Sequence, residues 1–87
     1  FWAEWCGTCG AMAPILRDLA LAVDGRVTVA TLDVEAHPDI ADRYGIRGLP
    51  TMLLFHGGAV VGKVTGFVPK KVLLDSLEAF LRSAPAS

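Results

Sequence analysis

The sequence predicts an α/β domain with a mixed β-sheet flanked by helices. Two short apolar runs, Val27–Val34 (VTVATLDV) and Thr51–Phe55 (TMLLF), have the composition of buried strands. They alternate with segments of helical periodicity, and helical crossovers imply parallel neighbours in a sheet. The Gly57-Gly58 pair directly after the second run predicts a tight hairpin, which adds an antiparallel pair.

The first elements are a strand end at Phe1–Ala3 and a helix. Apolar residues recur at helical spacing from residue 12 to residue 23, and Arg17 and Asp18 lie off this stripe. We expect the helix to end near Gly25, because glycine can adopt the left-handed cap conformation. After the strand Val27–Val34, a short helix is expected from His37-Pro38 to Gly45.

After the hairpin turn, the sequence predicts one more strand and one more helix. Val60–Thr65 is predicted to return as an edge strand that Gly66 ends, and Pro69–Arg82 is a last amphipathic helix. We interpret residues 1–83 as one domain, incomplete at its N-terminal end because Phe1–Ala3 resembles the end of a strand. Residues 84–87 are interpreted as a frayed tail.

Composition narrows the class of function. The 87 residues are 53% hydrophobic and 20% charged, which favours a globular fold. The net charge is −1 and the basic residues are scattered, so we expect neither nucleic acid nor a membrane as the partner. No apolar run approaches the ~18 residues of a membrane span. Two cysteines are too few for a disulfide framework, so a reducing, cytoplasmic location is expected.

Both cysteines lie in the hexapeptide W-C-G-T-C-G, from Trp5 to Gly10. Cys6 would lie just before the helix, where free amide N–H groups and the helix dipole favour the thiolate and lower its pKa. Cys9, one turn inside, is expected to be more buried and protonated. This uneven pair suits thiol–disulfide exchange, with Cys6 attacking a partner's disulfide and Cys9 resolving the mixed disulfide.

Two other readings of the pair are open at this point. A zinc site usually needs four ligands, and the only additional candidates are the isolated His37 and His56. Two inert core cysteines are the other alternative, although the flanking Gly7 and Gly10 favour an exposed loop. A Cys-x-x-Cys motif beside a βαβ-like pattern favours redox chemistry.

The chain resembles the thioredoxin family. The segment F-W-A-E-W-C-G-T-C (1–9) is similar to the family's active-site segment, and Y-G-I-R-G-L-P-T (44–51) to its second signature. F-H-G-G (55–58) lies where the family's hairpin turns, and G-F-V-P-K (66–70) looks most like the thioredoxin-2 branch. The resemblance implies a thioredoxin fold that lacks the first strand, the first helix and most of the central strand.

The resemblance also implies a general protein disulfide reductase with a Cys-Gly-Thr-Cys site. Cys6 would attack and Cys9 would resolve. The family's electron donor is thioredoxin reductase using NADPH, and the domain itself holds no cofactor or metal. Pro50 would be a cis-proline facing the disulfide, and the residue before it pairs main-chain groups with an extended substrate segment. The substrate groove would be formed by Trp5, Gly7, Leu49, Pro50 and Gly66.

The sequence departs from the family pattern at residues that would affect the ionisation of the two cysteines and the reduction potential. Thr8 replaces the usual proline, and Gly10 replaces a basic residue. A donor from Thr8 to the thiolate would stabilise the reduced form and make the protein a milder reductant. The family's buried aspartate immediately precedes the position of Phe1, and Thr31 replaces its lysine neighbour, so the base for Cys9 is unassigned.

Two alternatives to the reductase follow from the same residues. A disulfide oxidase or isomerase would use the same sulfurs at a higher potential, and a client-binding module would not use them at all. We also expect the 87-residue piece alone to be unstable, to swap or to aggregate. Without the central strand, Val27–Val34 and Thr51–Phe55 would have no common neighbour.

Overall fold

A computed structural model of the chain describes residues 1–23 and 25–83. It is an α/β arrangement, in agreement with the predicted class, and the expected tail at 84–87 lies outside the described residues. No helix among the described residues has the length and apolar character needed to cross a membrane. The elements follow in the order α1 (Gly7–Ala22), α2 (Pro38–Arg43), β1 (Thr51–His56), β2 (Ala59–Thr65) and α3 (Lys70–Ser83).

The hairpin β1–β2 forms as predicted. The strands are antiparallel, with Thr51 opposite Thr65, and the register shifts between Leu54 and Phe55. Gly57 and Gly58 at the turn have φ angles of 61° and 81°, in the left-handed region that glycine tolerates.

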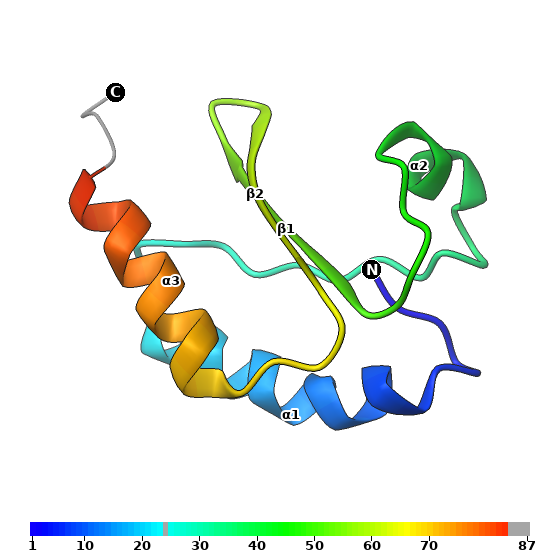
Figure 1. Ribbon diagram of the computed structural model, residues 1–87, viewed down its shortest axis with the longest axis horizontal. Coiled ribbons are helices and arrows are strands. Elements are labelled where there is room, and N and C mark those ends of the chain that lie inside the picture. Colours follow the sequence, from blue (N-terminus) through cyan, green and yellow to red (C-terminus); the bar gives the residue numbers. More distant parts are fainter. Residues whose placement is uncertain (24, 84–87) are drawn as a thin grey trace.

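Helices α1 and α3 pack together against one face of the hairpin (Figure 1). The helical stripe predicted for α1 supplies the core: Met12 and Leu19 are buried, and Leu73 of α3 meets them. Met52 of β1 and Val64 of β2 are partly buried against this cluster.

Helix α2 lies on the side of the hairpin opposite α1 and α3 (Figure 1). It begins at Pro38 with His37 at its N-cap, and Gly45 with φ 64° follows its end, as the sequence predicted. Tyr44, its C-cap, packs edge-on against Phe55 of β1, with ring centroids 5.4 Å apart. The ring centroid of Phe1 lies 6.3 Å from that of Tyr44.

The predicted strand Val27–Val34 is wrong for this chain. A single parallel bridge joins Trp2 to Asp33, through Trp2 N–H to Leu32 C=O (3.0 Å) and Val34 N–H to Trp2 C=O (3.0 Å). Residues 28–31 find no neighbouring strand in the described part of the chain. A strand requires such a partner, and apolar composition cannot replace it.

The first residues occupy the position between this segment and β1. On one side Trp2 bonds to residues 32 and 34, and on the other Phe1 exchanges main-chain hydrogen bonds with Thr51 (2.9 and 3.3 Å). The predicted strand end at Phe1–Ala3 is therefore present as a two-sided bridge. This connection also joins the start of β1 to the chain that leads into α1.

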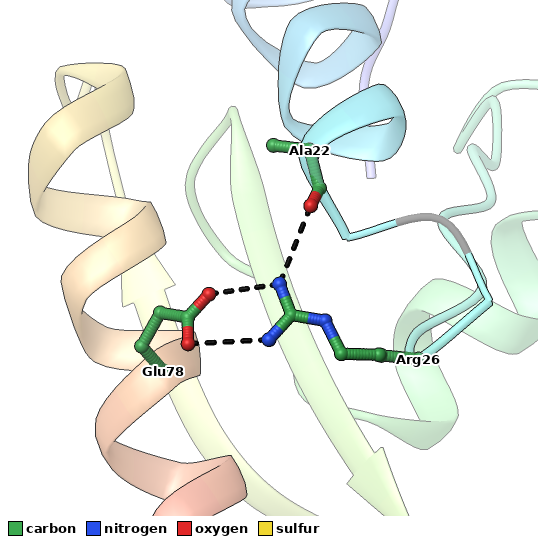
Figure 2. Close-up of polar contacts among 3 residues, drawn as sticks. All are labelled: Ala22, Arg26 and Glu78. Carbon is green, nitrogen blue, oxygen red and sulfur yellow. Dashed lines mark hydrogen bonds and ion pairs between the residues drawn. The ribbon is translucent and has the colours of Figure 1, made fainter.

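An ion pair fastens the turn after α1 to α3 (Figure 2). Arg26 donates from Nη2 to Glu78 Oε1 (2.8 Å) and from Nη1 to Glu78 Oε2 (3.2 Å), and Nη2 also donates to the carbonyl of Ala22 (3.3 Å). The guanidinium therefore bridges the end of α1 and the middle of α3 with a two-point geometry.

Candidate active site: the Cys6–Cys9 pair

Cys6 is the N-cap residue of α1. Its backbone is extended (φ −88°, ψ 106°), and its own N–H donates to the carbonyl of Ala3 (3.1 Å). The Cys6 sulfur accepts the N–H of Cys9 (3.2 Å), one of the helix donors that has no partner inside the helix. This is the position predicted from the sequence, and it directs the positive end of the helix dipole at Sγ.

The two cysteines are joined in a disulfide across the first turn, with their Cα atoms 5.3 Å apart. Their exposed fractions are close, 9% for Cys6 and 6% for Cys9. The difference in burial expected from the sequence is therefore small in this oxidised form. The pair is uneven in its hydrogen bonding, because Sγ of Cys6 receives the helix amide.

Thr8 is exposed and lies between the two sulfurs in sequence. Its hydroxyl oxygen is 3.5 Å from Sγ of Cys6, and the hydroxyl is the donor because a disulfide sulfur carries no hydrogen. Proline at this position would offer neither a hydroxyl nor an amide N–H. Thr8 is thus a polar neighbour of the same sulfur that receives the helix amide.

A cavity of about 230 Å³ lies next to Trp5, the residue that precedes Cys6 in the chain. Trp5, which is 69% exposed, and the half-buried Leu49 both contribute to its wall. The structure therefore brings together two of the residues predicted for a substrate groove. No sequence pattern indicated the other lining residues, although Ile46 and Arg47 lie inside the second signature motif. These residues are Val34, Pro38, Ala41, Asp42, Ile46 and Arg47.

The remaining predicted groove residues are placed by main-chain contacts. The Leu49–Pro50 peptide bond is cis, and the buried Pro50 accepts the N–H of Gly66 at 2.8 Å. Gly66 has φ 94°, a conformation that side chains rarely allow. Gly7 is exposed as the first residue of α1.

Among the described residues, the acids and histidines considered from the sequence form no site with the pair. Glu4 and Glu35 are both exposed, so neither is a buried acid beside Cys9. His37 caps α2, and His56 at the end of β1 packs edge-on against Phe80. Within residues 1–23 and 25–83, no three His, Cys, Asp or Glu side chains come together as metal ligands.

A second cavity, of about 510 Å³, lies at the opposite end of α1. It is larger than the cavity beside Trp5, but its lining offers Arg26 as the one charged side chain, and Arg26 is already paired with Glu78. We therefore place the chemistry at the Cys6–Cys9 disulfide, and the smaller cavity lies next to it in sequence through Trp5.

Comparison with known proteins gives the family. The thioredoxin family model matches residues 1–79. The chain is 42% identical over 81 residues to a thioredoxin of Synechocystis, which covers 93% of this chain and 76% of that relative. It is 43% identical over 79 residues to a thioredoxin of Rhodospirillum rubrum (91% and 76%). To thioredoxin 2 of Chlorobaculum tepidum it is 41% identical over 78 residues (90% and 72%).

These matches confirm the predicted family, while the assignment to the thioredoxin-2 branch stays a prediction. They agree with the geometry of the site, in which a Cys-x-x-Cys disulfide caps a helix. The chain belongs to the thioredoxin family and is a thioredoxin-type disulfide oxidoreductase.

Proposed function

We propose that the chain reduces disulfide bonds in partner proteins through Cys6 and Cys9. One observation carries the proposal: Cys6 is the N-cap of α1, its sulfur accepts the amide of Cys9, and the same sulfur is bonded to Cys9. A thiolate at Cys6 would keep this hydrogen bond and gain strength from it, because bonds to charged acceptors are stronger. Cys6 is therefore the nucleophile.

The reaction has two exchange steps. In the first, the Cys6 thiolate attacks one sulfur of the partner's disulfide, a mixed disulfide forms, and the partner's second sulfur leaves as a thiolate that takes up a proton. In the second, Cys9 loses its proton and attacks Cys6, which forms the Cys6–Cys9 bond and releases the partner's first sulfur as a thiol. Two electrons pass from the pair to the partner, and the oxidised pair is the product state.

The partner would dock across the exposed Trp5, Gly7 and the segment around Leu49-Pro50 and Gly66. Trp5 and Leu49 line one cavity, and Gly66 bonds to Pro50, which supports a continuous groove. In the proposed docking, main-chain groups of Leu49 pair with an extended segment of the client. Thioredoxin reductase with NADPH would return electrons to the pair, and the domain itself would bind no cofactor. We expect this cycle in a reducing compartment such as the cytoplasm.

A use as oxidase or isomerase has one observation in its favour. The Thr8 hydroxyl lies 3.5 Å from the Cys6 sulfur, and a donor at that position stabilises the thiolate and hence the reduced form. This raises the potential relative to a proline at the same position. The reductase remains the leading proposal because the relatives are named thioredoxins.

The test uses the full chain with NADPH, a thioredoxin reductase and insulin as a disulfide-bonded probe. We expect Cys6→Ser to abolish turnover and to form no mixed disulfide. Cys9→Ser should also lose turnover but accumulate a mixed disulfide that non-reducing mass spectrometry detects. Because the two variants differ in one atom each at matched positions, any difference between them separates attack from resolution. If the unmodified chain binds insulin but does not reduce it, and Cys6→Ser binds insulin equally well, the result would instead support a binding module.

A further inference from the structure

We infer that Met12 is a positioning residue for client docking, because its sulfur fixes the loop that holds Phe67 beside the groove. The inference rests on the proposed function, in which Gly66 at the start of this loop borders the groove. Met12 was interpreted from the sequence as core filling alone. The structure adds a polar contact to that packing.

The polar contact is a hydrogen bond from the backbone N–H of Val68 to Sδ of Met12, at 3.4 Å. Met12 is 1% exposed, and Val68 is one of the apolar residues packed against its cluster. Met12 lies one turn beyond Cys9 on the buried side of α1. The bond therefore connects the helix that carries both cysteines to the loop between β2 and α3.

The same loop is held at its other end. The N–H of Gly66 donates to the carbonyl of Pro50 at 2.8 Å, next to the cis peptide bond. Phe67 stands between these two anchored amides, and its side chain is 50% exposed. Because the amides on both sides are fixed, the backbone at Phe67 loses little further conformational entropy on binding, which favours a docking role.

The chemistry of the sulfur makes Met12 specific for this task. Thioether sulfur is a weak acceptor, whereas Leu of similar volume accepts nothing. Without the acceptor, the Val68 amide lacks its partner, so the loop is released on the side that faces α1. One net hydrogen bond corresponds to about fivefold in an equilibrium constant, which bounds the effect expected on docking.

The experiment compares Met12→Leu with Met52→Leu in the full chain. Met52 is a matched control because it packs against the same cluster, and within residues 1–23 and 25–83 its sulfur accepts no hydrogen bond. For insulin reduction, we expect Met12→Leu to raise KM about three- to fivefold with kcat unchanged. KM for a small aromatic disulfide, which needs no groove, and the midpoint potential should stay as in the unmodified chain. The Val68 amide should exchange with solvent faster only in Met12→Leu.

Phe67→Ala tests whether Met12 acts through the loop. We expect this variant to raise KM for insulin on its own, and Met12→Leu added to it should have little further effect, since residues that act through the same loop are not additive. Should Leu disturb the packing, norleucine in place of methionine keeps the shape and removes only the acceptor. The effect of norleucine on KM for insulin should then vanish in a chain that already carries Met12→Leu.

The outcomes separate this inference from the proposed function. If the unmodified chain does not reduce insulin, both are overturned. If it does, but Met12→Leu and Met52→Leu have equal KM, or the effects of Met12→Leu and Phe67→Ala simply add, the positioning role alone is wrong. A parallel fall in kcat and stability without a change in KM also overturns it, because packing alone would explain that result.

Discussion

The amide of Cys9 donates to the sulfur of Cys6 at 3.2 Å, so the two halves of the redox pair are linked by a hydrogen bond as well as by a covalent bond. When the disulfide is reduced, the covalent bond disappears and the amide remains. A donor that acts on a thiolate in place of a neutral sulfur gives a stronger bond. The geometry of the oxidised form thus already contains the donor that favours ionised Cys6 in the reduced form.

The Thr8 hydroxyl should add to this donor. We expect Thr8→Val to lower the midpoint potential of the full chain by about 10–30 mV, since tenfold in the exchange equilibrium corresponds to ~30 mV for two electrons. Valine keeps the branched shape and removes the hydroxyl that lies 3.5 Å from Cys6 Sγ. Equilibration in glutathione redox buffers measures the potential.

Thr8→Ser is the matched control for this prediction. Serine keeps the hydroxyl, so its potential should stay near that of the unmodified chain. Thr8→Pro should shift the potential in the same direction as Thr8→Val. An unchanged or higher potential in the valine variant would show that the hydroxyl does not stabilise the thiolate.

How much of the fold the sequence predicts depends on where each interaction partner lies. Helix α1 and the β1–β2 hairpin were predicted because their patterns, the apolar stripe and the Gly57-Gly58 turn, are local. The run Val27–Val34 has equally strong strand composition, but a strand also needs a neighbour that is distant in sequence. The described chain provides that neighbour only at Trp2, so the prediction failed there.

The candidate site divides in the same way. The spacing of Cys6 and Cys9 next to a helical stripe was enough to predict the N-cap sulfur, because all its partners lie within one turn. Leu49 and Pro50 entered only through the family resemblance, since no local pattern specifies a cis peptide bond. The hydrogen bond from Val68 to Met12 joins residues 56 positions apart, and no sequence pattern could have indicated it.

Gly66 should be far more sensitive to substitution than Gly7. At φ 94° an alanine would be strained even though the space around it is open. We expect Gly66→Ala to reduce the free energy of unfolding by about 1–2 kcal/mol. Gly7→Ala, in open space at the first turn of α1, should change it by less than about 0.5 kcal/mol. Urea denaturation compares the two variants, and equal losses would contradict the prediction.

Backbone amides of residues 28–31 should exchange rapidly with solvent in the 87-residue chain, because they find no strand partner in the described part of it. The antiparallel ladder directs the Met52 and Leu54 amides towards β2, so these should exchange more slowly. Hydrogen–deuterium exchange followed by NMR measures both groups in one sample. Protection of residues 28–31 equal to that of Met52 would show that a strand forms there after all.

The Arg26–Glu78 pair should make stability depend on pH in a defined direction. The hydrogen bond from Arg26 holds the pKa of Glu78 below its usual value of 4.5. A carboxyl with a lowered pKa in the folded state stabilises it above the usual pKa, and this contribution is lost as the pH falls through the folded-state value. Both side chains are partly exposed, 46% for Arg26 and 33% for Glu78, so the effect should be small and weaker at high salt.

We therefore expect Glu78→Gln to lower the Tm of the full chain by about 2 °C at pH 7 in low salt, and this effect should shrink as the pH falls below the usual pKa of Glu78. Asp75→Asn is the control, because the Lys71–Asp75 pair joins residues of the same helix and is more exposed (85% and 63%). Asp75→Asn should change Tm less, because the loss of the Lys71–Asp75 pair does not separate two distant segments of the chain. A Glu78→Gln effect that does not shrink on acidification, or that is equal to that of Asp75→Asn at pH 7, would show that the bridge between α1 and α3 does not stabilise the fold.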